Sequence, residues 1–324
     1  MKKAAPPMET HPIYLPPLPG WVTQNHSKTS ETEQFLSGAS LAILHVVLVN
    51  PSDALPSQGT LPAELLRNRL ALRAAEACLK LEGRRDSEAD IRDAYYLARA
   101  GDDLGPAGEM YVRWRKLSAV VLKRKDWLPR LKGCVSEGVA QELPEWIDTT
   151  MDQGAGQGGS PVAQASKMVE LVMAAFPREE AAALICGDLI LARALGWSQP
   201  VPLLGLHLKR RALLASPDEL VLACHQATTS GAQDAVRLGH DLTRRAQRLR
   251  EVAPKLRAKG SDQAVALFLR EDAVLPSTML APRILGTSIP MTDRAARRLC
   301  DRLVELGVVR ELTGRSTFRL YGVA

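Results

Sequence analysis

The stretch from Ser261 to Val323 contains the sequence pattern that most restricts what this chain can fold into. A short apolar segment, 263–269, leads through a proline-bounded connector, 275–290, to an arginine-rich segment, 292–306. Two short segments in which apolar and polar residues alternate close the stretch, on either side of a glycine. Helical spacing followed by period-two alternation predicts helix, helix, basic helix and hairpin, in that order, within one small unit.

The arginine-rich segment predicts an amphipathic helix over 292–306. Arg294, Arg297 and Arg298 fall on or beside one face of this helix. Thr292 is a good N-cap residue, so the open backbone amides and the positive end of the helix dipole lie beside these arginines. The opposite face is an apolar stripe that can pack on 263–269, and its members are Ala296, Leu299, Leu303 and Leu306.

A β-hairpin is predicted after this helix. Gly307 stands at the C′ position, where glycine commonly ends a helix. Apolar and polar residues alternate over 308–321 on both sides of Gly314, which favours a tight turn at that glycine. Arg315 and Ser316 are then expected at the tip of the hairpin, where they can reach phosphate groups.

The order of these elements is that of a winged helix-turn-helix, and the charge distribution indicates its partner. From Arg244 to the C-terminus the chain has 16 Lys+Arg against 8 Asp+Glu, whereas the preceding residues have 26 against 28. A basic C-terminal quarter on a near-neutral body favours a polyanion, and we expect double-stranded DNA. The expected DNA-binding residues are Thr292, Arg294, Arg297, Arg298, Arg315 and Ser316.

The rest of the chain is predicted to be a bundle of helices. Apolar residues make up 46% of the sequence and aromatic residues only 4%, so the core consists mainly of Leu, Ala and Val, which favours packed helices. Between 127 and 147 the periodicity weakens, and no helix is predicted there. Capping signals and periodicity predict helices over 30–50, 60–83, 87–97, 110–121, 162–176, 178–195, 200–214 and 217–250.

Breaks in this pattern divide the chain into regions. The N-terminus is rich in proline, and Trp21 is the residue expected to dock it. The glycine-rich segment 154–161 predicts a break inside the helical body. The predicted regions are a disordered, proline-rich lead-in at 1–30, an N-terminal helical region at 31–153, a second helical region at 160–259 and the winged helix-turn-helix at 261–324.

Four carboxylates around a Gly/Pro turn are the strongest sign of chemistry in the body. They are Asp93, Asp102, Asp103 and Glu109. Clustered carboxylates can bind a divalent metal or share a proton, but the simpler interpretation is that Asp102 or Asp103 caps the following helix. The sequence contains no phosphate-binding loop and no nucleophile motif, so neither an enzyme nor a cofactor is expected.

The cysteines and histidines do not indicate a metal site. The five cysteines are scattered without a CxxC pair, so we expect buried thiols in a reducing compartment and no bound metal. His45 and His207 lie within apolar segments and are expected to be satisfied core or boundary residues. The longest apolar run, 41–49, is too short to span a bilayer. We therefore expect a cytoplasmic protein that binds no membrane.

Several motifs of this chain resemble the signature motifs of a single known family. They are Gly101–Gly108, Pro200–Leu204, Val252–Gly260, Asp293–Leu299 and Val309–Arg315. On these motifs the chain resembles an uncharacterised bacterial family catalogued as domain of unknown function 1403, over most of its length from Trp21 onward. The resemblance implies kinship and carries no activity. The chain departs from the family pattern at Tyr95-Tyr96, at Leu104 and in a longer connector over 281–290.

A looser likeness is to the helical and winged-helix parts of Fic-type proteins. Cys78–Gly83 resembles their inhibitory (Ser/Thr)xxxE(Gly/Asn) motif, with cysteine in place of the hydroxyl residue. The catalytic HPFxxGNGR motif is absent from this sequence, so the likeness implies no nucleotide transfer.

The sequence therefore predicts a mainly α protein, with a multi-helix body followed by a winged helix-turn-helix that has a small β-hairpin. The favoured function is DNA binding by a transcriptional or replicon-associated regulator, whose helical body mediates dimerisation or binds a protein partner. The alternative is a protein-interaction adaptor whose winged helix packs on the body or on a partner. Exposed Phe or Leu on the supposed DNA face, or burial of Arg294 and Arg298 against the body, would favour the adaptor, whereas arginines on that face count against it.

Overall fold

The structure is a computed structural model that describes residues 15–24, 29–49, 60–152 and 159–324. These residues form a mainly helical protein with a small antiparallel sheet of two strands near the C-terminus, as the sequence predicted. The helices of the body are α1 (Gly20–Thr23), α2 (Ser30–Val49), α3 (Ala63–Leu81), α4 (Glu88–Tyr96), α5 (Gly105–Ala119), η2 (Leu128–Leu131), α6 (Glu137–Asp152), α8 (Pro161–Ala175), α9 (Glu180–Ala194), α10 (Leu204–His207), α11 (Arg210–Leu213) and α12 (Pro217–Val252). The C-terminal unit, residues 253–324, contains η3 (Ala253–Lys255), α13 (Ser261–Phe268), η4 (Pro276–Leu280), α14 (Asp293–Glu305), β1 (Val309–Glu311) and β2 (Tyr321–Val323).

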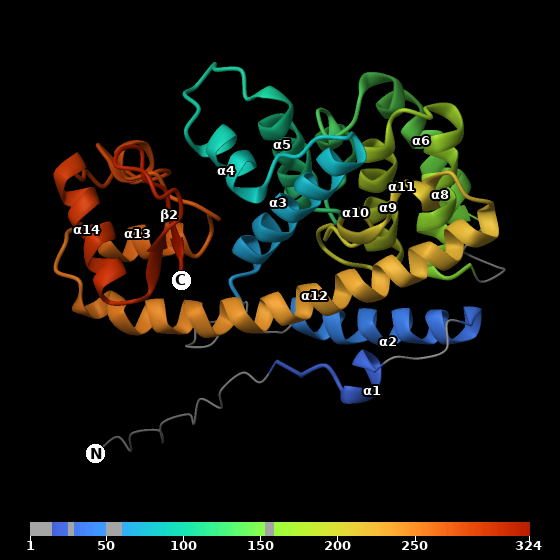
Figure 1. The fold of residues 1–324 in the computed structure, drawn as a ribbon, viewed down its shortest axis with the longest axis horizontal. Coiled ribbons are helices and arrows are strands. Elements are labelled where there is room, and N and C mark those ends of the chain that lie inside the picture. The colour runs from blue at the N-terminus through green and yellow to red at the C-terminus, as the bar shows by residue number, and fades with distance from the viewer. Residues whose placement is uncertain (1–14, 25–28, 50–59, 153–158) are drawn as a thin grey trace, which may run out of the picture.

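Helix α12 runs along most of the molecule (Figure 1). It is one helix of 36 residues, about 54 Å long at 1.5 Å per residue. Helix α2 lies along one side of α12, and α8, α10 and α3 pack on it from the other side. At its C-terminal end α12 leads through η3 into the C-terminal unit, so this helix connects the two ends of the fold.

The local sequence explains why α12 is continuous. Pro217 occupies the first turn, and Ser216 and Glu219 form a capping box in which the Glu219 carboxylate accepts from the Ser216 amide at 3.2 Å. Small residues then let neighbouring segments come close. A Cβ atom on Gly231 would lie only 2.9 Å from the backbone of Leu203, so this contact requires glycine.

Two segments of the body differ from the sequence prediction. Helix α6 was missed, because Pro144 lies inside it and obscures its helical pattern. The predicted helix over 200–214 is wrong, since this segment contains only the single turns α10 and α11. Asp188, a fully buried residue of α9, accepts hydrogen bonds from the amides of 203–205 at 3.0, 2.8 and 3.0 Å and so fixes the start of α10. The helix then ends because the backbone is extended at Leu208 and Lys209.

The N-terminal segment is ordered where the structure describes it. Helix α1 packs on α2, with Val22 buried and Trp21 stacked on Phe35 at 5.6 Å between ring centroids. Trp21 was the predicted anchor, but its side chain is 45% exposed. The buried Val22 is the main apolar anchor of α1 instead. The predicted disorder over 1–30 does not extend through 15–24, and the remainder of that region lies largely outside the described residues.

Helix α2 begins at Ser30, which the pattern Ser30-x-x-Glu33 predicts to be its cap, so the helix starts one residue earlier than predicted. Thr29, and not Ser30, caps it, with its hydroxyl accepting from the Thr32 amide at 3.3 Å. Of the helices that the structure describes, α2 alone is long and apolar enough to cross a membrane by length and composition, and here it packs along α12. The predicted break at 154–161 falls largely outside the described residues, and α8 begins at Pro161.

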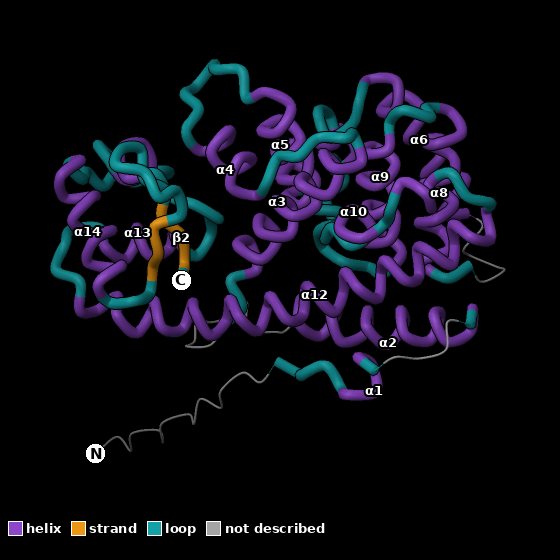
Figure 2. The backbone as a smooth tube through the Cα atoms, viewed as in Figure 1, coloured by secondary structure: helices purple, strands orange, loops and turns teal. Residues whose placement is uncertain are grey.

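The sheet of the C-terminal unit is orange in Figure 2. Strands β1 and β2 pair antiparallel, with Val309 opposite Val323, and Val274 bridges to Tyr321 on the other side of β2. The predicted tight hairpin at Gly314 is therefore wrong, because the strands pair farther from that glycine and leave a longer loop, 312–320, between them. We call this segment the 312–320 loop.

Candidate nucleic-acid interface

Helix α14 is amphipathic in the way that the sequence predicted. The hydroxyl of Thr292 accepts from the Ala295 amide at 3.2 Å, which confirms the N-cap. Ala296, Leu299 and Leu303 are buried, and Cys300, which the predicted stripe omitted, is buried beside them. This apolar face packs on η4 and β1, which fixes α14 against the unit and leaves its other face exposed.

The exposed face of α14 carries the predicted arginines. Arg294, Arg297 and Arg298 are all exposed. The Arg297 guanidinium pairs with Asp293 at 2.8 Å on the same helix, where both side chains remain well exposed. Arg294 and Arg298 have no ion-pair partner among the described residues. Their charge is therefore available to a partner molecule.

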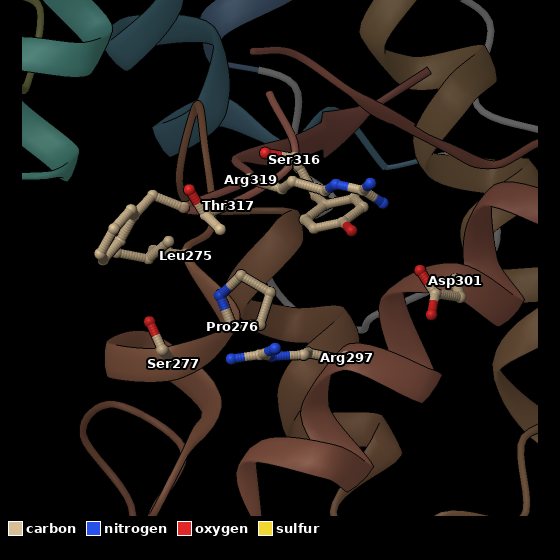
Figure 3. Close-up of a pocket in the computed structure, with 10 residues that line it drawn as sticks. Leu275, Pro276, Ser277, Arg297, Asp301, Ser316, Thr317 and Arg319 are labelled. Carbon is tan, nitrogen blue, oxygen red and sulfur yellow. The ribbon is translucent and has the colours of Figure 1, made fainter. Parts of the chain in front are cut away.

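A hollow of about 430 Å³ opens on one flank of α14 (Figure 3). Figure 3 shows Arg297 beside Pro276 on one side, with Ser316 and Arg319 of the 312–320 loop on the other. Asp301 also lines the hollow and is its one acidic residue. Hydroxyl and guanidinium donors on two sides of an open hollow are suited to phosphate oxygens.

A second hollow, of about 550 Å³, opens on the other flank of α14. Its basic lining comes from two segments, the helix itself and the stretch that follows α12. The basic residues are Arg294, Arg298 and Arg302 of α14, with Lys255 and Arg257 from the preceding segment. Helix α14 is thus a ridge between two hollows that both contain cationic side chains.

Lys255, Arg257 and Arg302 were not among the predicted DNA-binding residues. Lys255 and Arg257 precede α14 by more than thirty residues, and only the folded unit brings them to its flank. The sequence did contain a signal, because both residues lie within the basic motif Val252–Gly260.

Phe318 is a further surface residue that the sequence did not identify. The predicted alternation placed it with Leu320, which is fully buried, but Phe318 is 63% exposed. Its φ of 54° is in the left-handed region, which is unfavourable for a residue other than glycine. The 312–320 loop holds an exposed aromatic ring at the first hollow, beside Arg319.

The 312–320 loop is organised by Glu311. Its carboxylate accepts from the amides of Thr313 and Gly314, each at 2.9 Å, and from the Thr313 hydroxyl. Burial acts to raise the pKa of Glu311, but these hydrogen bonds outweigh it and the pKa is lowered. Glu311 is therefore ionised at neutral pH and fixes the start of the loop.

Of the two predicted loop residues, one faces the hollow and one contacts the body. Ser316 lines the first hollow. The Arg315 guanidinium pairs with Asp93 of α4 at 2.6 Å. Arg315 therefore connects the loop to the body in this structure.

A buried acidic pair attaches the C-terminal unit to the body. Asp272, which is fully buried, pairs with Arg69 of α3 and with Arg92 of α4. Glu271 accepts from Arg115 of α5 at 2.9 Å. The attachment surface is separate from the exposed face of α14, because it is formed by the turn after α13.

Tyr96 completes the environment of Glu271. Its hydroxyl donates to the Glu271 carboxylate at 3.2 Å. Burial raises the pKa of Tyr96 well above its usual value, so the phenol keeps its proton at neutral pH and can donate it.

The carboxylates of the Gly/Pro turn do not converge on one site. Asp102 accepts from the Arg99 amide at 2.8 Å, and Asp103 accepts from the Gly105 amide at 2.8 Å, at the start of α5. Asp93 pairs with Arg315. No group of three or more His, Cys, Asp or Glu side chains within the described ranges is placed to hold a metal ion. Asp103 alone bonds the first turn of α5, from the position before the N-cap Leu104, whereas Asp102 closes a turn with Arg99 and does not cap the helix as predicted.

The other predicted residues have structural partners. All five cysteines are free and buried, as predicted. His207 pairs with Asp234 at 3.0 Å, and His45 accepts from the Trp197 indole at 3.0 Å. His207 lies at the boundary of the core as predicted, whereas His45 is exposed, so its predicted core or boundary position is wrong.

Comparison with known proteins identifies the family of the chain. The family model described as protein of unknown function (DUF1403) matches residues 8–323. A search of curated proteins finds no match. The looser likeness to Fic-type proteins is not shown by these comparisons. Because the family model covers nearly the whole chain, the protein belongs to the DUF1403 family of proteins of unknown function.

Proposed function

We propose that the C-terminal unit is a winged helix that binds double-stranded DNA, with α14 as its recognition helix. The element order supports this assignment: α13, a strand residue at Val274, η4, α14, β1, the 312–320 loop and β2 follow one another. The middle helix of the motif is reduced to the single turn η4. The observation that carries the proposal is the position of α14, exposed between two hollows with cationic linings.

The geometry of duplex DNA explains why this arrangement is suitable. A helix in the major groove lies between two phosphate backbones, and both backbones require neutralisation. In the proposed complex Lys255 and Arg257, which line one hollow, contact one backbone, and Arg319 with Ser316, which line the other hollow, contact the second backbone. Arg298, at the centre of the exposed face, can donate to guanine O6 and N7 or to phosphate.

The 312–320 loop supplies the wing of the proposed fold. Its exposed Phe318 ring can stack on a base or sugar that the loop reaches. Arg315 is the loop residue that we expect to add a phosphate contact when its pair with Asp93 opens. The loop therefore adds both apolar and charged contacts beside the recognition helix.

The exposure of Arg294 and Arg298 favours DNA over the adaptor alternative. In the adaptor, these side chains would be covered by the body or by a protein. The unit does pack on the body, mainly through Glu271 and Asp272 on another surface, and also through the pair of Arg315 with Asp93 at the 312–320 loop. That loop contact and the exposed Phe318 are the features that favour the adaptor. We infer a non-enzymatic, cytoplasmic regulator of transcription or of a replicon, whose helical body mediates dimerisation or binds a protein partner.

A salt titration of DNA affinity tests the proposal. Fluorescence anisotropy with a labelled duplex should give a slope of log K against log salt of about −4 to −5 if four to six phosphates are engaged. Replacing Arg294, Arg297 and Arg298 together by Ala should weaken binding and reduce the slope by about 2 to 3.

A matched control separates recognition from net charge. Lys123, Lys125 and Lys132 are exposed on the body, and their replacement by Ala removes the same charge. The control should retain the wild-type affinity and slope. Equal losses in the two triple variants, or full affinity without the α14 arginines, would contradict the role of α14.

A further inference from the structure

A third hollow, of about 460 Å³, lies in the helical body, on a surface formed by α2, the start of α8, the end of α9 and α12. Its apolar lining includes Leu41, Ala42, Val162 and Leu195. No acidic or basic side chain is among the described residues that line it; its polar groups are hydroxyls, one amide and two imidazoles. An uncharged, largely apolar molecule is the chemical class that such a surface accepts.

The first imidazole, that of His225, is fixed in one tautomer by Ser37. The Ser37 hydroxyl has a single proton and donates it to the Gln34 carbonyl at 2.9 Å. The same oxygen lies 2.7 Å from His225 Nδ1, so it must accept a proton there. His225 is therefore protonated on Nδ1, and Nε2 is left as an acceptor with no partner among the described residues. Burial lowers the pKa of His225, which keeps the ring neutral.

The second imidazole, that of His45, is fixed in the opposite tautomer. Its Nδ1 lies 3.0 Å from Nε1 of Trp197. An indole N–H can only donate, so His45 Nδ1 accepts and the neutral ring is protonated on Nε2. His45 therefore offers a donor, whereas His225 offers an acceptor. The two rings are not interchangeable.

The two rings contact α2 or belong to it at positions two turns apart. Ser37, which holds His225, and His45 are eight residues apart on α2, which is about 12 Å at 1.5 Å per residue. Between them α2 presents Leu41 and Ala42. A molecule that satisfies both rings must therefore be elongated, with an apolar middle.

We propose that this hollow binds a small, elongated, uncharged molecule that donates a hydrogen bond to His225 at one end and accepts one from His45 at the other. The site does not depend on DNA binding. A ligand with its two polar groups exchanged would place its donor against the donor of His45 and its acceptor against the acceptor of His225, so neither hydrogen bond would form. The fixed tautomers thus give the site a direction as well as a polarity.

NMR of the full chain with ¹⁵N-labelled histidine tests both parts of the proposal. The ring shifts should report Nδ1–H for His225 and Nε2–H for His45. The probe is 4′-hydroxyacetophenone, which has a donor hydroxyl and an acceptor carbonyl at opposite ends of an apolar ring. It should shift both rings, whereas 4′-methoxyacetophenone and 4-ethylphenol, which each lack one group, should bind at least about threefold more weakly.

Two substitutions at exposed positions of α2 serve as the matched pair. Ala42→Phe fills the hollow without touching either hydrogen-bonded pair and should abolish the shifts, whereas Val46→Phe adds the same ring outside the hollow and should retain them. The opposite tautomer at either histidine would overturn the proposal. So would a probe that shifts neither ring, or one that binds equally to the two variants.

Discussion

Two sets of arginines in this protein have opposite environments. At the attachment surface, Arg92 and Arg115 are largely buried and pair with Asp272 and Glu271 at 2.6 and 2.9 Å. On α14, Arg294 and Arg298 face solvent and have no ion-pair partner among the described residues. The first set uses its charge within the fold, and the second leaves its charge available for binding. Only the second set can attract a polyanion.

This difference separates the contributions of the basic residues to stability and to binding. Removing a buried partner leaves an uncompensated charge in the interior and destabilises the fold. Removing an exposed arginine changes the surface potential and leaves the core intact. Substitutions at the two surfaces should therefore affect different measurements.

The largest effect is expected for Asp272→Asn. This substitution leaves Arg69 and Arg92 without their buried acid, and it should lower the free energy of unfolding by about 3–5 kcal/mol. Chemical denaturation measures the change. Asp262→Asn, at an exposed position of α13, is the control and should change the free energy of unfolding by less than about 0.5 kcal/mol. A similar loss of unfolding free energy in both variants would show that the buried ion pairs of Asp272 contribute no more to stability than an exposed carboxylate does.

A buried acid without a cation should respond to pH. Burial raises the pKa of Asp188 to about 7, against three amide hydrogen bonds that act to lower it. Since the folded pKa exceeds the unfolded value, the folded state binds the proton more tightly. The contribution of Asp188 to stability is therefore greatest below about pH 4 and is lost as the pH rises through about 7.

The variant Asp188→Asn isolates this effect. The free energy of unfolding of the wild type, relative to that of the variant, should fall by on the order of 2–4 kcal/mol between pH 4 and pH 8. Denaturant titrations at four pH values across this range measure it. A difference that stays constant or rises with pH would contradict the raised pKa.

A smaller effect, on binding alone, is expected for Lys255→Ala with Arg257→Ala. These side chains line the second hollow, and their loss should weaken DNA binding roughly tenfold and reduce the salt slope by about 2. The unfolding midpoint should not change. Lys123→Ala with Lys125→Ala removes the same charge from the body and should leave affinity unaltered. Wild-type DNA affinity in the Lys255→Ala, Arg257→Ala variant would show that the second hollow does not contact DNA.

The smallest effect is expected for Asp93→Ala. It frees Arg315 from a partly exposed ion pair, a class of interaction that contributes up to about 1 kcal/mol. DNA affinity should therefore rise by up to about fivefold and should fall again when Arg315→Ala is added. An unchanged affinity in the single variant would show that Arg315 does not contact DNA.

Much of the body was predictable because its helices depend on local signals. The capping box of Ser87 and Asp90 and the glycines that follow helices are encoded within a few residues. The missed helix α6 and the wrong helix over 200–214 depend on more distant features. Pro144 obscures the helical pattern of the first, and in the second the carboxylate of Asp188, from α9, fixes the start of the short helix α10.

The candidate interface was predictable along α14 and less so around it. Helical periodicity alone places Arg294 and Arg298 on the exposed face. The flanking Lys255 and Arg257 reach that helix only through the course of the chain after α12. The position of Arg315 depends on Asp93, a residue more than two hundred positions earlier. Contacts between residues so far apart in the chain produce no periodic pattern, so they cannot be predicted from the sequence in this way.

Hydrogen–deuterium exchange of the full chain, with and without duplex DNA, tests whether α14 and its two flanks bind DNA. We expect slower amide exchange on DNA binding in 255–259, 292–306 and the 312–320 loop, with no change at the 270–272 attachment turn. Protection confined to the helical body, or spread evenly over all basic segments, would contradict the assignment of α14 and its two flanks as the DNA-binding surface.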